Sequence, residues 1–123
     1  MAGLNEFDNM TRIIQESVPG RQVTLAHIIA SPDETLYEKL GLDPRIDYEK
    51  AAIGVTTVVP SETAIIMADI ALKSSGITLG FVDRFSGSLI ITGSVSEVES
   101  AMEAMEEYVQ DKLNYSVCPI TKT

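Results

Sequence analysis

The side chains that usually carry out catalysis are scarce in this sequence. His27 is the only histidine, and it lies inside an apolar run. Cys118 is the only cysteine, and no histidine lies near it in the chain. Acid–base and nucleophilic catalysis both need such a group beside a second one that activates it. We therefore expect His27 to be a packed or sheet-edge histidine and Cys118 to be an unreactive thiol.

The other candidates for a ligand or metal site are also weak. Asp83 and Arg84 are adjacent in a short polar stretch, where an acid and a cation can hold a ligand. The simpler interpretation is a pair of solvated turn charges or an interface pair. The glutamates of residues 97–107 lack the Asp, Asn and Gly spacing of a calcium-binding loop, and no phosphate-cradling glycine motif opens a helix. We expect no catalytic residue, no cofactor and no metal ion, and therefore no enzyme.

Length and charge exclude several classes of protein. With 123 residues, the chain is one domain with a core of its own. Its formal net charge of −9 argues against nucleic acid as a partner, because a phosphate binder needs a basic face. No apolar run reaches the roughly 18 residues of a membrane span. The first twelve residues lack the pattern of a secretory signal, and a lone cysteine is typical of a reducing compartment.

The second half of the chain begins with a strand and a helix. Residues 52–59 are apolar and rich in β-branched side chains, which predicts a covered strand. A helix is predicted to follow over residues 64–75. Ser61 is expected to cap its first turn, and Gly76 is expected to end it in a left-handed conformation.

A hairpin and a second helix complete this half. Two apolar runs, residues 77–83 and 88–93, flank a turn that contains a glycine and predict a β-hairpin. Ser94 and Glu97 have the spacing of a capping box. The helix that they begin is predicted to be amphipathic up to residue 113, with its glutamates on a solvated face.

The first half predicts further strands. Residues 12–18 form a short strand candidate, and Pro19 and Gly20 occupy the middle of a type II turn. Residues 22–30 are predicted to form a strand inside the sheet. Residues 115–121 are expected to form an edge strand, because Pro119 argues against a central position.

A short helix is expected after the strand of residues 22–30. Ser31 is expected to cap it, Pro32 to occupy its first position and Glu34 to complete a capping box, with Gly41 at its end. Together the elements predict an α/β fold of the α+β sandwich type, in which a mainly antiparallel sheet carries the helices.

The helix over residues 64–75 is too apolar for one sheet to cover. After Glu62, its strongly polar side chains are Asp69 and Lys73, which lie four apart on one narrow strip. A helix packed on a single sheet needs one apolar face. We therefore expect a second subunit to cover part of this helix, whose apolar residues are Ile65, Ile66, Met67, Ile70 and Leu72.

Several motifs resemble the shell-protein domain of bacterial microcompartments. They are Ala52-Ile-Gly-Val55, Ala68-Asp-Ile-Ala-Leu-Lys73, Asp83-Arg-Phe-Ser-Gly87 and Thr92-Gly-Ser-Val-Ser-Glu97. A further run, Ala26-His-Ile-Ile-Ala-Ser-Pro-Asp-Glu34, resembles the ending of common shell proteins but here precedes the core. This order resembles the circularly permuted shell proteins of ethanolamine, propanediol and choline compartments, and the similarity covers the chain from about Arg12.

This resemblance implies a structural protein of the compartment shell, inside the cytoplasm. Its partners would be five copies of itself in a cyclic hexamer, other shell proteins and the enclosed enzymes, with no nucleic acid and no membrane. It also implies three units: a leader over residues 1–11, a barrel strand and turn over residues 12–21, and one BMC shell domain over residues 22–123.

The resemblance also implies roles for individual residues. Lys73, with Asp69 beside it, matches the edge through which hexamers meet. Phe85, Ser86 and Gly87 match the turn that rims the central opening. The residues expected to build a small β-barrel over that opening are Ile13, Ile14, Gln15, Glu16, Ser17 and Val18.

A function of another class remains open from the sequence. An acidic βαββα domain of this size is also compatible with an oligomeric ligand-sensing regulatory domain that binds a small metabolite between subunits. Such a sensor needs convergent polar groups in a cleft. Outside Asp83 and Arg84, the sequence offers few of them.

Overall fold

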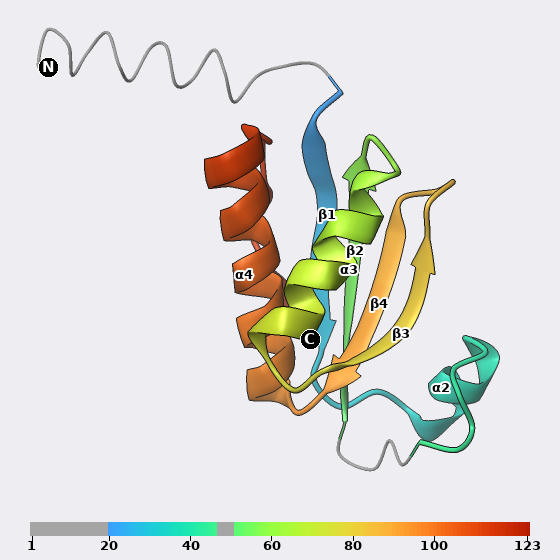
Figure 1. Ribbon diagram of the computed structural model, residues 1–123. Helices are drawn as coiled ribbons and strands as arrows, with labels where there is room; N and C mark the ends of the chain where they lie inside the picture. The colour runs from blue at the N-terminus through green and yellow to red at the C-terminus, as the bar shows by residue number, and fades with distance from the viewer. Residues whose placement is uncertain (1–19, 47–50) are drawn as a thin grey trace, which may run out of the picture.

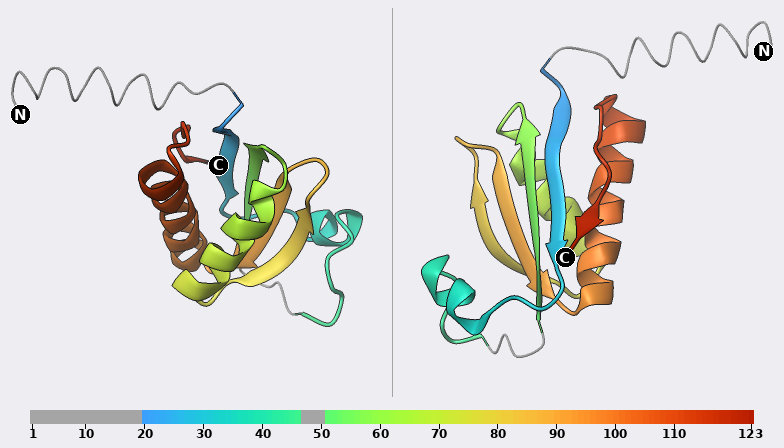
Figure 2. Two further views of the ribbon diagram at one scale, coloured as in Figure 1. Left: turned by 45° about the horizontal axis from the view of Figure 1, so that its top comes forward. Right: turned by 180° about the vertical axis from the view of Figure 1, so that it is seen from behind.

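The computed structural model describes residues 20–46 and 51–123, which form one sheet with two long helices on the same face (Figure 1). In these residues the sheet has five strands in the order β3-β4-β2-β1-β5. Figure 2 shows this order from behind. The strands are β1 (Gln22–Ile29), β2 (Ala52–Val59), β3 (Thr78–Asp83), β4 (Ser88–Gly93) and β5 (Thr121–Lys122). The predicted α/β fold with a mainly antiparallel sheet is confirmed.

The central strand β2 pairs antiparallel with β1 on one side and with β4 on the other, and β3 and β4 form the predicted hairpin. The C-terminal strand β5 lies at the edge, as expected, and runs parallel to β1. It begins only at Thr121, the last residue of the predicted strand, and the part of the prediction before it forms one isolated bridge, between Ser116 and Gln22, in the described chain. Pro119 has no N–H to donate, which interrupts the ladder between these two points.

Helix α3 (Thr63–Ser74) follows β2 and begins differently from the prediction. Glu62 occupies the cap position without a side-chain bond to the backbone, so Ser61 is not the cap. Backbone carbonyls satisfy the first amides instead, since Ala64 N donates to the Ser61 carbonyl at 3.1 Å. The helix ends at Ser75, whose backbone is extended with φ of −158°, so the expected left-handed stop at Gly76 is also wrong.

Helix α4 (Val95–Leu113) has the predicted capping box, in which Ser94 and Glu97 each accept from the other's backbone amide. It ends at Asn114, which is left-handed with φ of 60°. The short helix α2 (Glu34–Lys39) is capped by Asp33, which accepts from Thr35 N at 2.9 Å, and not by Ser31. Because this helix begins two residues later than expected for a Ser31 cap, Glu34 cannot complete a capping box.

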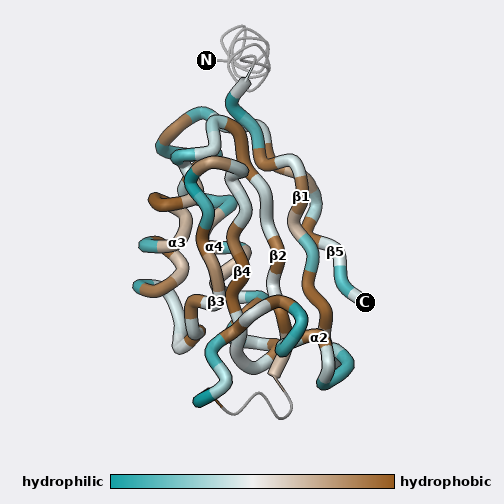
Figure 3. The backbone as a smooth tube through the Cα atoms, turned by 90° about the vertical axis from the view of Figure 1, so that its right-hand side faces the viewer, coloured by the Kyte–Doolittle hydropathy of each residue, from teal (hydrophilic) through white to brown (hydrophobic). Residues whose placement is uncertain are grey.

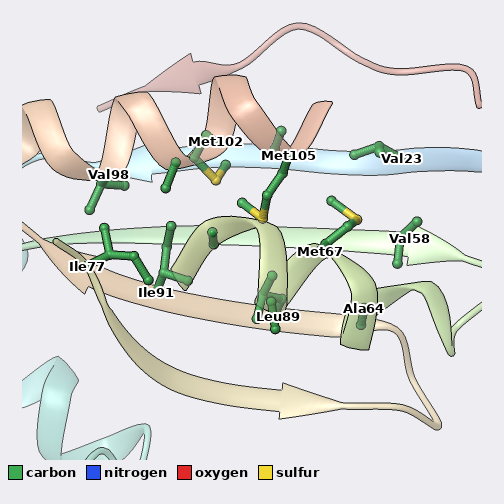
Figure 4. Packing of buried hydrophobic residues seen from close by; sticks show 14 of the residues in the cluster. Val23, Val58, Ala64, Met67, Ile77, Leu89, Ile91, Val98, Met102 and Met105 are labelled. Carbon is green, nitrogen blue, oxygen red and sulfur yellow. The ribbon is translucent and has the colours of Figure 1, made fainter. Parts of the chain in front are cut away.

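The main core lies between the sheet and the two long helices (Figure 4). Met67, Met102 and Met105 from the helices pack against the sheet side chains Leu89 and Ile91. The helix α4 approaches β2 so closely that a Cβ added at Gly54 would lie 2.8 Å from Val98 Cγ1. A glycine is therefore needed at this contact.

The C-terminal segment is held to the start of α3 by a buried bond, in which the Thr63 and Tyr115 hydroxyls lie 2.6 Å apart. On the opposite face of the sheet, α2 covers only one end, through a small cluster around Tyr37, Leu42 and Ile53. Figure 3 shows hydrophobic stretches on the outer side of α3, away from the sheet. Both faces of the molecule therefore keep apolar surface exposed.

Candidate assembly surfaces

The turn between β3 and β4 is built by Asp83. One carboxylate oxygen accepts from Phe85 N at 2.8 Å, and the other accepts from the Ser86 hydroxyl at 2.9 Å. Both bonds lower the pKa of Asp83, and the bond from the Phe85 backbone amide has the larger effect. The guanidinium of Arg84 lies 4.9 Å from the centre of the Phe85 ring. The two charged residues thus serve the turn and do not converge on a ligand, in agreement with the simpler interpretation.

The turn projects one aromatic ring and is fixed at its base by a glycine. Phe85 is 80% exposed, although it is a large apolar side chain. Gly87 has φ of +77°, and a Cβ added there would lie 2.2 Å from the Val58 carbonyl oxygen. The Gly87 carbonyl in turn accepts from Val58 N at 3.0 Å. The base of the turn therefore packs closely against the end of β2.

The strip expected on α3 is present. Lys73 Nζ lies 2.7 Å from Asp69 Oδ2, and both side chains are exposed. The hydrogen bond and the charge of Asp69 raise the pKa of Lys73, so the lysine stays cationic. Ile65 and Leu72, which are 51% and 48% exposed, lie on one side of this strip. Ile66, which is 44% exposed, lies on the other, so the domain leaves α3 uncovered on both sides, as predicted.

The turn and the lysine lie at opposite ends of α3. A Cβ at Gly87 would also lie 3.1 Å from Ser61 Cα, so the turn sits beside the start of the helix. Lys73 is in the last turn of this twelve-residue helix. With a rise of about 1.5 Å per residue, the two features are separated by roughly 15 Å along the axis. The structure therefore does not bring the candidate rim and the candidate edge together.

The surroundings of His27 and Cys118 agree with a sheet-edge histidine and an unreactive thiol. His27 Nδ1 lies 2.5 Å from Thr121 Oγ1, and its Nε2 lies 2.9 Å from Thr123 Oγ1. The histidine therefore fastens the edge strand β5 to β1. Cys118 is half-buried, and burial, followed by the charge of Glu106, raises the pKa of its thiol. A raised thiol pKa disfavours the reactive thiolate.

Glu106 differs from the other glutamates of α4. The prediction placed it on the solvated face, but its Oε2 is buried and has no hydrogen-bond partner among the residues that the structure describes. Burial raises the pKa of Glu106 to about 7. Cys118 of the C-terminal segment lies close enough to Glu106 to feel its charge. The sequence signal was the position of Glu106 four residues after Met102, next to the apolar stripe of the helix.

The candidate barrel residues Ile13 to Val18 lie outside the described residues. The described chain begins at Gly20, whose φ of +80° suits the predicted turn. Strand β1 starts at the same end of the sheet as the β3–β4 turn, because Gln22 pairs with Val59 and Ser88 pairs with Thr57 (Figure 1). Within residues 20–46 and 51–123, no cluster of three potential metal ligands and no membrane-spanning helix occurs.

Comparison with known proteins identifies the family. Residues 52–121 match the family described as BMC domain. The chain is 48% identical over 120 residues to the bacterial microcompartment shell protein CutR of Streptococcus intermedius, which covers 98% of this chain and 99% of the relative. It is 46% identical over 112 residues to the shell protein PduU of Salmonella typhimurium, covering 91% of this chain and 93% of the relative.

The fold agrees with this relationship. A solved structure described as a CutR flat hexamer superposes with a TM-score of 0.78 at 48% identity, covering 88% of this chain and 95% of the other. The resemblance seen in the sequence motifs is thus confirmed over nearly the whole chain. The chain belongs to the BMC-domain family of bacterial microcompartment shell proteins.

Proposed function

We propose that this protein is a structural component of a microcompartment shell, and that six copies form a cyclic hexamer that tiles edge to edge with its neighbours. The relative with 48% identity that was solved as a flat hexamer supports this assembly. The uncovered apolar surface of α3 supplies its physical basis, since burial of apolar area stabilises association by about 25 cal/mol per Å² before the costs of binding are subtracted.

The observation that carries this proposal is the separation of the turn from Lys73. We propose that α3 runs outward from the six-fold axis, so that features at one end of the helix lie near the axis and features at the other end lie at the perimeter. We assign Phe85, Ser86 and Gly87 to the rim of the central opening. Lys73 and Asp69 are then assigned to the outer edge, where they meet the next hexamer.

The order of elements supports a circular permutation. The match to the BMC domain begins at residue 52, so β1 and α2 precede it. Yet β1 lies between β2 and β5 within the sheet. Strand β1 is thus part of the domain's sheet although it precedes the matching region in the sequence. A circular permutation produces this arrangement.

We further propose that the N-terminal segments cover the opening. Strand β1 begins at the end of the sheet that carries the rim turn, and we propose that residues 12–18 approach the opening from that end. Seven extended residues span roughly 23 Å, and strands from six subunits can close a ring without a free edge. Ile14, Glu16 and Val18 would lie on one face of such a barrel and Ile13, Gln15 and Ser17 on the other.

Electron microscopy of the purified protein tests the assembly. Rings and extended arrays are expected. Discrete trimers that gain thermal stability when a small metabolite is added would contradict the proposal and favour a ligand-sensing regulatory domain. The turn bonds of Asp83 do not favour that alternative, because both of its carboxylate oxygens are already engaged.

A further inference from the structure

We propose that the C-terminal segment, residues 115–123, is a strap that lifts away from α4 when the carboxyl group of Glu106 ionises. The strap follows the last turn of α4 and runs between this helix and β1, parallel to the strand (Figure 2). Lys122 pairs with a glutamate of α4, and Thr121 pairs with His27 of β1. All of these contacts lie within one subunit, so the opening of the strap does not depend on the proposed hexamer.

Hydrogen bonds fasten the strap to β1 at two places. Near its start, Ser116 N donates to the Arg21 carbonyl at 3.1 Å. At its other end, Thr123 N donates to the Ile28 carbonyl at 2.9 Å. The ring nitrogens of His27 add contacts to two threonine hydroxyls there. Both ends of the strap are thus anchored to the sheet.

The middle of the strap is held in a different way. Between Ser116 and Thr121 the described chain has no ladder pairing with β1, and Pro119 has no N–H to donate. The side chains of Val117 and Ile120 are partly buried against the main core. The middle of the strap therefore depends on apolar contact and on the exclusion of water from the side chains beneath it.

Two glutamates show which side of α4 the strap follows. Lys122 Nζ lies 3.1 Å from Glu99 Oε1, and Cys118 lies close enough to Glu106 to feel its charge. Glu99 and Glu106 are seven residues apart, which is about two helical turns, so they lie on the same side of α4. Glu106 is therefore next to the middle of the strap, the part that has no ladder pairing.

This position suits a neutral acid better than a carboxylate. Glu106 Oε2 is buried and has no hydrogen-bond partner among residues 20–46 and 51–123. Burial raises the pKa of Glu106 to about 7. A charged oxygen without a donor is costly to bury, and access to water removes this cost. Ionisation therefore favours the lifted strap, in which water reaches the carboxylate.

The charged and titratable groups around Glu106 do not offset this effect. On α4, Glu103 lies one turn earlier and carries the same charge. In the strap, Lys122 is already paired with another glutamate, and burial raises the pKa of the Cys118 thiol, which therefore stays neutral at pH 8. On β1, both ring nitrogens of His27 contact threonine hydroxyls of the strap.

The sign of the pH effect follows from the two states of the strap. The closed strap holds the Glu106 proton with a pKa of about 7, and the lifted strap leaves this group near its ordinary value of 4.5. The closed state therefore binds the proton more tightly. Its population is highest below pH 4.5 and falls as the pH rises through about 7.

Hydrogen exchange on the full chain, followed by mass spectrometry, tests the strap. Glu106→Gln resembles the neutral acid, and Glu107→Gln on the exposed face is the matched control. Each variant is compared with the wild type at the same pH, which keeps the intrinsic exchange rate and the state of His27 constant. At pH 8 the peptide of residues 115–123 should exchange about fivefold more slowly in Glu106→Gln than in the wild type. At pH 5 the two should agree, and the control should match the wild type at both pH values.

The peptide of residues 98–109, from the buried face of α4, is the internal reference for unfolding of the whole chain. In the wild type at pH 8, residues 115–123 should be clearly less protected than this reference, because the strap opens while the helix stays folded. Equal protection of the two peptides would mean that the strap opens only when the chain unfolds. That result, or equal exchange of residues 115–123 in wild type and Glu106→Gln at pH 8, would overturn the inference.

Discussion

Lys73 and Asp69 form an exposed ion pair on the last two turns of α3, with Nζ and Oδ2 separated by 2.7 Å. Exposed pairs of this kind contribute little to folding stability, because water screens them and both side chains lose freedom. We therefore infer that the pair serves contacts between neighbouring hexamers and not the stability of the single subunit. Its position at the end of α3 opposite the rim turn suits that role.

Replacement of Lys73 by Asp is expected to abolish extended sheets and to leave hexamers intact, because it sets two like charges at the proposed edge. Electron microscopy measures the sheets, and light scattering measures the hexamers. Lys112→Asp, on the exposed last turn of α4, is the matched control and should still form sheets. Sheets from the Lys73 variant, or loss of its hexamer, would show that the edge assignment is wrong.

Gly87→Ala is expected to destabilise the fold more than Gly41→Ala. Both glycines are left-handed, with φ of +77° and +72°, so each alanine costs about 1 kcal/mol of backbone strain. At Gly87 the new Cβ would meet the Val58 carbonyl oxygen, whereas no atom of residues 20–46 and 51–123 lies within 4 Å of a Cβ at Gly41. The clash should add about 1–3 kcal/mol.

Denaturant midpoints of the two glycine variants measure this difference at one protomer concentration. Equal midpoints would mean that the rim turn moves freely away from β2.

Glu106 predicts a stability that depends on pH. Burial raises the pKa of Glu106 from its ordinary value of 4.5 to about 7 in the folded chain. Between these values the folded state binds the proton more tightly than the unfolded state, so stability falls as the pH rises from 4.5 through 7. The loss is on the order of 1 kcal/mol, since the side chain keeps some contact with water.

Glu106→Gln is expected to equal the wild type near pH 5 and to exceed its stability at pH 8, because glutamine resembles the neutral acid. Glu107→Gln, on the exposed face, is the control and should show no such gain. Unfolding curves at both pH values provide the measurement. A Glu106→Gln variant that gains nothing at pH 8 would contradict the burial of this carboxyl group.

The N-terminal segment gives a prediction for hydrogen exchange. If residues 12–18 form a closed barrel in the hexamer, the amides of residues 13–17 should exchange slowly, and those of the leader at residues 1–11 should exchange fast. The comparison is made by mass spectrometry on assembled hexamers. Exchange at residues 13–17 as fast as in a free peptide would mean that the opening is uncovered.

Local patterns predicted most of the fold because their causes are local. The capping box of Ser94 and Glu97 depends on residues three apart, and the β3–β4 hairpin depends on one turn. Each was therefore visible in the sequence. The cap of α2 was misplaced by two residues because Ser31 and Asp33 are both good caps, and spacing alone favoured Ser31.

Features that depend on contacts between distant parts of the chain were harder to predict from the sequence. Strand β5 pairs with β1 across about ninety residues, and Glu106 is partly buried within reach of Cys118 in the C-terminal segment, so neither feature could be predicted from periodicity. The family resemblance supplied the proposed roles of Lys73, Phe85 and the barrel residues. These roles are contacts with neighbouring subunits, which the sequence pattern of one chain does not reveal. For Lys73 and Phe85, the single chain shows only that the side chains are exposed.

The mass of the protein in solution tests the central claim most directly. Each chain has a mass of 13.3 kDa, so six chains give about 80 kDa. Light scattering coupled to size exclusion, at micromolar protomer concentration, is expected to report this mass, with Ile65→Asp shifting it toward smaller species. A single species at 13.3 kDa for the wild type would contradict the account, since α3 would then keep its apolar surface in water.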